Sequence, residues 1–417
     1  MSDSRNGSPR KATNAELVLE ALLDADVDRG LLREEIAQRT ELARATVTNT
    51  VATLRDQHGV LSDRRRRKPD YVRVRADAGY VVGVSLAHTR VTCGIADLWG
   101  NLLYQPQSER RKVDEQPHPS LDLAADLIRK SLDDIDASKV IGIGIAVAAP
   151  VVPGKGLIRE SLGGPWPASM KEWLTIDPLK EVKQRLRDVK SLRCGYVLGN
   201  AGNLGALPEY MTAAADWDDD DELQDMIYVA WGDGLHAGLV LGGDVYCGAG
   251  LAGEIGHISV PGQPPTGAEC DRCGRDDCLE LVISKNAIQD RIGRELKGID
   301  FDEEPKANTP AIRELKAAAR NLGLVLGPLL TVINPQAVVI GGPSEKCYPV
   351  IIPEIHSGIR ESGILPAFKD VRIRLGEHGP LAPLKGAMLE ALRTQRLRYL
   401  LSLEHGKRPA ARERALA

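Results

Sequence analysis

Three cysteines and a histidine lie close together in the chain and have the residue types of a zinc site. Cys270, Cys273 and Cys278 fall within nine residues, and His257 precedes them. Zn²⁺ prefers thiolate and imidazole ligands in a tetrahedral shell, and four protein ligands leave no position for a reactive water. We therefore predict that these four residues bind Zn²⁺ and that the metal shapes the chain. Cysteines without a metal are the alternative.

A disulfide is a weaker interpretation of this cluster. The other cysteines, Cys93, Cys194, Cys247 and Cys347, are scattered along the chain. Nothing at the N-terminus resembles a secretory signal, so we expect a cytoplasmic protein, in whose reducing environment clustered cysteines usually bind metal.

The residues around the cysteines resemble a family signature. Glu254-Ile-Gly-His257, the three cysteines and Glu280 are similar to the motif of the ROK family, which groups sugar-responsive repressors and sugar kinases. Two departures are Cys-x₂-Cys in place of the usual Cys-x-Cys, and Asp277 in place of a glycine. The resemblance runs from about Leu17 to about Leu400. It implies a duplicated actin-like, RNase H-like α/β fold in which ATP and sugar share a cleft.

The sugar side of that cleft is retained. The resemblance implies that Asn200, Glu254, His257 and Glu280 contact sugar hydroxyls, and carboxylates are suitable acceptors for hydroxyl groups. His257 would then serve twice, with one ring nitrogen on zinc and the other toward the ligand. The alternative is that the acids only brace the zinc loop. The effector is a sugar, a sugar phosphate or another small molecule.

The phosphate side is altered. ROK kinases hold phosphates with a strand that ends in Asp-x-Gly-Gly-Thr, and the matching residues here are Ser85, Leu86, Ala87, His88 and Thr89. The family's catalytic base is replaced by Ala201. Phosphoryl transfer needs both a phosphate cradle and a positioned base. We therefore expect no enzymatic activity, although the turn Gly232-Asp-Gly234 is retained.

The length and composition place limits on the elements that carry these residues. The chain has 417 residues, 43% of them hydrophobic and 27% charged, which suggests two or three globular domains. The net charge of −4 argues against a uniformly basic nucleic-acid binder but allows a local basic patch. No run of about 18 apolar residues appears, so no membrane contact is expected.

The first 75 residues have the pattern of a DNA-reading domain. Apolar side chains recur at helical spacing in residues 15–24, and a short helix is expected at 32–37. Within residues 40–54 we expect a turn that contains Leu42 and then the next helix. With Val47, Val51 and Leu54 in the core, the side chains left outward are Arg44, Thr46, Thr48 and Asn49. This layout predicts a helix-turn-helix whose second helix enters the major groove. A plain three-helix bundle would show the same apolar spacing.

A basic hairpin follows these helices. The segments before and after residues 63–70 alternate like strands, and the tip carries Arg64, Arg65, Arg66, Arg67 and Lys68. Arginine is well suited to the narrow minor groove of A·T-rich DNA, so we predict a wing that contacts DNA. A solvated charge run is the alternative. A winged helix-turn-helix ahead of a ROK domain resembles the family's repressors.

The rest of the chain has an α/β pattern. Strands are expected from Tyr80, Arg90 and Val140, as a pair within 227–243 and at 333–342, with helices at about 120–135 and at 383–402. We divide the chain into a disordered tail (1–12), a winged helix-turn-helix domain (13–76), a ROK domain (77–402, with the zinc loop at 254–280) and a flexible tail (403–417).

These features predict a sequence-specific transcriptional regulator, most simply a repressor. Its partners would be a double-stranded DNA operator and a small sugar effector, and the family resemblance implies a homodimer or homotetramer. Two alternatives are an active sugar kinase with a DNA-binding head, and an architectural DNA-binding protein whose ROK body only oligomerises. Ser85 and Ala201 speak against the first, whereas the retained Asn200, Glu254 and His257 speak against the second.

Overall fold

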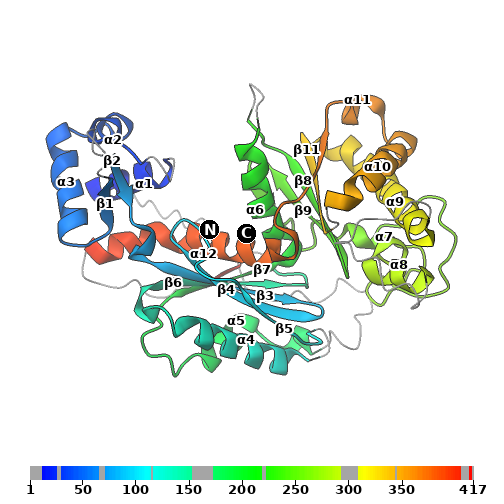
Figure 1. Cartoon of the computed structure of the whole chain (residues 1–417), viewed down its shortest axis with the longest axis horizontal. Coiled ribbons are helices and arrows are strands. Elements are labelled where there is room, and N and C mark those ends of the chain that lie inside the picture. Colours follow the sequence, from blue (N-terminus) through cyan, green and yellow to red (C-terminus); the bar gives the residue numbers. More distant parts are fainter. Residues whose placement is uncertain are drawn as a thin grey trace, which may run out of the picture.

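The computed structural model describes nine stretches of the chain. They are residues 12–25, 30–64, 71–113, 116–152, 172–217, 222–292, 309–342, 345–404 and 413–415. These residues form a small helical head and two α/β lobes, with the head and the second lobe standing on opposite ends of the first (Figure 1).

The head is a winged helix-turn-helix. It contains α1 (Asn14–Leu23), α2 (Arg33–Thr40), α3 (Arg44–Asp56) and the antiparallel strands β1 (Leu61–Arg64) and β2 (Tyr71–Val74). A capping box between Thr13 and Glu16 begins α1, and Glu41 ends α2 in the left-handed conformation that turns the chain toward α3. The predicted helices and wing strands are confirmed. The wing tip, Arg65–Lys68, and the tail before residue 12 lie outside the described residues, as does the side chain of Arg64.

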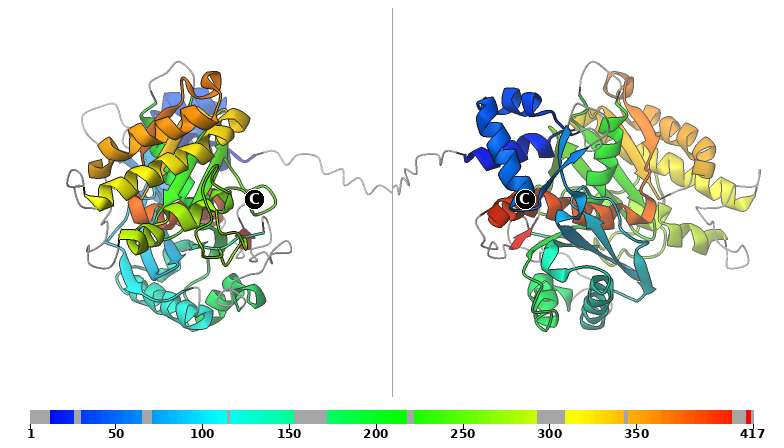
Figure 2. Two further views of the ribbon diagram at one scale, coloured as in Figure 1. Left: turned by 90° about the vertical axis from the view of Figure 1, so that its right-hand side faces the viewer. Right: turned by 60° about the vertical axis from the view of Figure 1, so that its left-hand side comes forward.

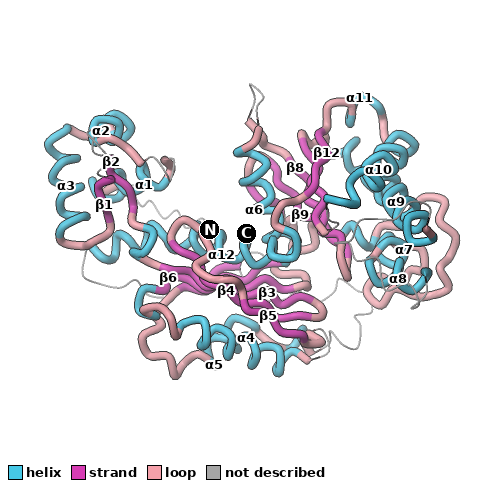
Figure 3. The backbone as a smooth tube through the Cα atoms, in the orientation of Figure 1, coloured by secondary structure: helices cyan, strands magenta, loops and turns pink. Residues whose placement is uncertain are grey.

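The first lobe is built on a six-stranded sheet. Its strands are β3 (Tyr80–Ala87), β4 (Arg90–Asp97), β5 (Gln107–Arg110), β6 (Val140–Val147), β7 (Gly195–Asn200) and β13 (Glu413–Ala415), in the order β13-β7-β6-β3-β4-β5. The helices α4 (Pro117–Leu132) and α5 (Pro178–Arg185) cover one face, and α12 (Ala382–Glu404) covers the other (Figure 3). All eight residues of β6 are buried, as expected for a strand covered on both faces.

The second lobe repeats this plan. Its sheet order is β10-β9-β8-β11-β12, from β8 (Met226–Trp231), β9 (Leu235–Leu241), β10 (Asp244–Tyr246), β11 (Ala337–Gly341) and β12 (Arg372–Leu375). One face packs against α6 (Ala201–Ala215). The other packs against α7 (Leu279–Ile283), α8 (Lys285–Ile292), α9 (Pro310–Ile333) and α10 (Tyr348–Ser362), and α11 (Leu365–Phe368) follows. The predicted duplicated α/β fold is confirmed.

Among the described residues one helix, α9, is long and apolar enough to cross a membrane by length and composition alone. Its residues Leu315, Leu322 and Leu326 lie in the core of the second lobe, which explains its apolar character.

Within the segment 403–417, for which we expect a flexible tail, some of the described residues have regular secondary structure. The helix α12 continues to Glu404, and β13 pairs in parallel with β7.

Candidate functional site

The structure brings the four predicted metal ligands together. The donor atoms of His257, Cys270, Cys273 and Cys278 all lie within 4.8 Å of one another, and Cys270 Sγ is 3.5 Å from His257 Nδ1. Zinc bonds of roughly 2.0–2.3 Å place tetrahedral ligand atoms about 3.3–3.8 Å apart, so small movements of these side chains would bring the cluster to this size. A one-turn 3₁₀ helix (Ile255–His257) presents the imidazole, and the Ser259–Cys278 bridge closes the loop around it. This cluster could hold a metal ion.

The cluster favours a thiolate. Hydrogen bonding with Cys278, and also with His257, lowers the pKa of Cys270 to about 3, against the opposing effect of burial. Burial acts to lower the pKa of His257, but the bond to Cys270 and the carboxylates of Glu280 and Glu254 raise it overall. The thiolate is the form of cysteine that ligates metals, so the surroundings fit this role.

The second nitrogen of His257 faces Glu254. Its Nε2 lies 3.8 Å from Glu254 Oε2, and burial raises the pKa of Glu254. Glu280 accepts a hydrogen bond of 3.0 Å from the backbone N–H of Leu235 through Oε2. One oxygen of Glu280 therefore braces the start of β9, whereas Glu254 and His257 form a polar pair beside the metal cluster.

Asn200 lies at the end of β7 and caps α6. Its Oδ1 accepts hydrogen bonds from the backbone N–H groups of Gly202 and Asn203, at 2.8 and 3.2 Å, and its Nδ2 donates to Ala149 O at 3.2 Å. These bonds fix the amide, so a ligand would meet it through its remaining N–H. Ala201 is buried in an apolar cluster with Leu204, Cys247 and Ala387.

Two further polar side chains near these residues, Arg272 and His236, were not predicted from the sequence. Arg272, between two of the cysteines, donates a 3.2 Å hydrogen bond from Nη2 to Ala148 O in the first lobe. Burial, with smaller effects from His88 and Arg272, lowers the pKa of His236 to about 3, and its Nε2 has no hydrogen-bond partner among the described residues. The spacing of residues along the sequence does not predict that these side chains belong to the site, because the sequence does not show that the zinc loop reaches the opposite lobe.

The two turns at the phosphate side of the cleft touch each other. Thr89, in the β3–β4 turn, donates a 3.2 Å hydrogen bond to Asp233 Oδ2 in the β8–β9 turn. His88 Nε2 lies 2.9 Å from the position that a Cβ on Gly234 would take. We call His88, Thr89, Asp233 and Gly234 the interlobe clasp.

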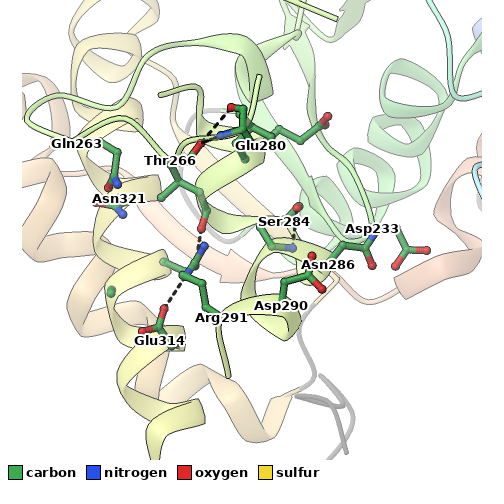
Figure 4. Close-up of a pocket in the computed structure, with 16 residues that line it drawn as sticks. Asp233, Gln263, Thr266, Glu280, Ser284, Asn286, Asp290, Arg291, Glu314 and Asn321 are labelled. Atoms are coloured by element: carbon green, nitrogen blue, oxygen red, sulfur yellow. Dashed lines mark hydrogen bonds and ion pairs between the residues drawn. The ribbon is translucent and has the colours of Figure 1, made fainter. Parts of the chain in front are cut away.

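A hollow of about 660 Å³ lies between α7, α8, α9 and the loop at 263–268, and its lining includes Asp233 and Glu280 (Figure 4). Arg291 bonds Glu314 Oε2 at 2.7 Å and Val282 O at 2.6 Å, and the Thr266 hydroxyl bonds Asp276 O at 2.7 Å. Much of the hollow's polar surface is thus already paired within the protein.

The helix α3 carries the predicted DNA-contacting residues. Val47, Val51 and Leu54 are buried, whereas Arg44, Thr48 and Asn49 are exposed and Thr46 is half-buried. Arg44 forms a 3.0 Å ion pair with Glu34 on α2, and the Thr48 hydroxyl donates a 2.9 Å hydrogen bond to Arg44 O. An exposed ion pair is worth little, so Arg44 is available to an anionic partner.

Comparison with known proteins places the chain. The profile of the ROK family matches residues 81–392. The xylose repressor of Caldicellulosiruptor bescii is 25% identical over 393 residues, which covers 88% of this chain and 92% of that protein. A ROK family transcriptional regulator described as a homologue of the E. coli MLC protein superposes with a TM-score of 0.69 at 20% identity, covering 94% of this chain and 98% of that one.

A kinase structure is similar to a large part of the chain. The ROK family glucokinase from Streptomyces griseus, solved with glucose and AMPPNP, superposes with a TM-score of 0.61 at 21% identity and covers 76% of this chain and 100% of its own. The match of the family profile to most of the chain, together with the fold and the motif residues, establishes that this chain belongs to the ROK family.

Proposed function

We propose that this chain is a DNA-binding transcriptional repressor whose cleft binds a sugar or sugar phosphate and does not phosphorylate it. The winged head supports DNA binding, and the relative at 25% identity carries the name xylose repressor. Arg44, Thr48 and Asn49 would face base edges and phosphates, and Arg64–Lys68 would enter the minor groove. The repressor would act in the cytoplasm as a homodimer or homotetramer on a palindromic operator.

The observation that carries the regulatory interpretation is the interlobe clasp. A kinase needs room between these two turns for the transferred phosphate and its metal ions. Here His88, which stands in place of a glycine of the kinase motif, places its imidazole against Gly234, and Thr89 hydrogen-bonds Asp233 directly. Ala201, where the family's base belongs, is buried among apolar side chains. Both requirements for phosphoryl transfer are therefore unmet.

We propose that the ion held by the Cys₃His cluster is Zn²⁺. Three cysteine ligands and one imidazole fill a tetrahedral shell, so the metal would have a structural role. It would fix the ring of His257 so that Nε2 points toward Glu254 and the cleft. Asn200, Glu254, His257 and Glu280 would bind the sugar hydroxyls, and the domain limits of 13–76 and 77–402 would separate reading from sensing.

A combined binding assay tests this function. Operator sequences are selected from random duplexes with the full-length protein, and the melting temperature is measured with D-xylose, D-glucose and glucose 6-phosphate. We expect at least one sugar to raise the melting temperature and to weaken operator binding, and Mg-ATP to do neither. Turnover of any of these sugars with ATP, or failure to select any duplex, would overturn the proposal.

A further inference from the structure

One helix, α12, contacts both the head and the residues beside Asn200. The C-terminal half of α12 packs Leu392, Tyr399 and Leu400 in one hydrophobic cluster with residues of α1 and β2. Its N-terminal half places Ala387 in the small cluster that contains Ala201, directly after Asn200. Figures 1 and 2 show α12, in orange-red, passing beneath the head and along the sheet toward α6.

The contact at the cleft end of α12 is backbone on backbone. A Cβ at Gly386 would lie 1.8 Å from Leu204 O in α6, and a Cβ at Gly144 of β6 would lie 1.9 Å from Ala387 O. Helices and strands that touch without intervening side chains cannot shift separately, because packed interiors are dense and do not compress. A displacement of α6 caused by a ligand at its Asn200 cap must therefore move α12.

The contact at the head end runs through Arg396 and Trp99. The Arg396 guanidinium lies over the Trp99 ring at 5.5 Å from its centroid and donates a 3.0 Å hydrogen bond to Leu98 O. Trp99 Nε1 donates a 3.2 Å hydrogen bond to Val74 O, the last residue of the wing strand β2. Tyr399 also donates a 3.2 Å hydrogen bond to Ala78 O, in the segment that leaves the wing.

This junction also reaches α1. Burial lowers the pKa of Arg396, and the carboxylate of Asp24, directly after α1, acts in the opposite direction. The guanidinium therefore lies where α12, the wing strand and the end of α1 meet. A lysine could not replace this arginine, because only the planar guanidinium both stacks on an aromatic ring and hydrogen-bonds in a fixed geometry.

We propose that Arg396 and Trp99 are positioning residues that transmit the state of the cleft, through α12, to the orientation of the wing. This inference rests on the proposed function and adds its regulation. A ligand changes DNA affinity only as far as it distinguishes two arrangements of head and body. In this proposal, the contacts of Arg396 with Trp99 and of Trp99 with Val74 differ between the two arrangements.

A double-mutant cycle tests the link without any effector. Gly386→Ala separates α12 from α6 at the cleft end, and Ala387→Gly, which removes a methyl group from the small cluster that α12 shares with Ala201 and Leu204, serves as the second variant if the first does not fold. Arg396→Lys keeps the charge at the head end but loses the planar group. We expect the cleft-end variant to change the Kd for the selected duplex about fivefold or more in the wild-type background, and less than about twofold together with Arg396→Lys.

A matched control and a second measurement complete the test. Arg372 lies over Trp217 at 4.3 Å in the second lobe, so Arg372→Lys removes the same kind of contact away from the head. It should leave the fivefold effect intact. Trp99→Phe, which keeps a ring but loses the bond to Val74, should abolish the effect as Arg396→Lys does. Equal effects of the cleft-end variant in all backgrounds would refute the link, whereas the absence of any sugar response would refute only the proposed function.

Discussion

At the scale of single residues, His257 has a different neighbour at each of its ring nitrogens. Its Nδ1 lies 3.5 Å from Cys270 Sγ, and its Nε2 lies 3.8 Å from Glu254 Oε2. A metal on one nitrogen orients the ring and fixes which nitrogen remains for a ligand. The metal site that we propose would thus adjoin Glu254, and its four protein ligands would leave no position for a reactive water.

The metal prediction concerns Cys273. The purified protein should contain about one Zn²⁺ per chain, and Cys273→Ser should reduce this content and lower the melting temperature, because three ligands bind zinc less tightly than four. Cys347→Ala is the control, since this buried cysteine of the same lobe lies outside the cluster. Elemental analysis measures the metal, and zinc-free protein purified without chelator would contradict the assignment.

The sensing prediction concerns Glu254. Glu254→Gln keeps the shape of the side chain but removes its charge, so effector affinity should fall about tenfold or more, as expected for loss of a charged hydrogen-bond acceptor. DNA affinity without effector should change less than about twofold. Titration calorimetry and fluorescence anisotropy measure the two affinities. Glu269→Gln, an exposed position in the zinc loop, should change neither. A full response in Glu254→Gln would place the ligand elsewhere.

At the scale of elements, α3 presents a polar face to solvent because its apolar residues are committed to the head core. Val47, Val51 and Leu54 are buried, and the opposite face carries Arg44, Thr48 and Asn49. The Thr48 hydroxyl is bonded to its own helix, which leaves the Asn49 amide as the more adaptable group for base edges.

This difference between Thr48 and Asn49 predicts that Asn49 contributes to the choice of operator sequence. Asn49→Ala should relax the preference for one base pair of the selected operator, at a cost of about 1–3 kcal/mol in specific binding. Arg55→Ala, at the other end of α3 and paired with Asp56 at 2.7 Å, should leave the preference unchanged. Competition between operator variants measures both. An unaltered preference in Asn49→Ala would remove this side chain from the interface.

At the scale of the whole molecule, two hydrogen bonds link the lobes. Thr89 reaches Asp233, and Arg272 reaches Ala148, each from one lobe to the other. Hydrogen bonds that involve a charged group contribute about 1.5–3 kcal/mol each, so a ligand that prefers another lobe spacing would have to replace them. The effector that we propose would act on these two contacts.

A kinase must bring together a phosphate cradle and a catalytic base, so its activity depends on the whole molecule. Ala201→Asp restores the family's base, but Ser85, Ala87 and His88 still replace the phosphate cradle, so no ATP-dependent phosphorylation of D-glucose should appear. The variant should also melt at a lower temperature, because it places a carboxylate in an apolar cluster. A coupled assay for ADP measures turnover, and activity in this single variant would show that the clasp opens readily.

The sequence by itself determined the parts that depend on local pattern. Helical spacing located α1 and α3, and alternation located the wing strand β2, because a one-sided core imposes these periods directly. The strands β3 and β4 were predicted from apolar runs, as expected for strands that are buried on both faces. The short spacing of Cys270, Cys273 and Cys278 was enough to predict the ligand cluster, since ligands close in sequence need little else to meet. The motif residues also predicted the family.

Only the tertiary structure decided what meets across long separations. Thr89 and Asp233 are apart in sequence and meet because two similar lobes face each other, and Arg272 reaches Ala148 for the same reason. No periodicity encodes such contacts. The pairing of β13 with β7, and the passage of α12 from the cleft to the head, likewise depend on how whole elements pack, since the apolar face of α12 specifies burial but not a partner.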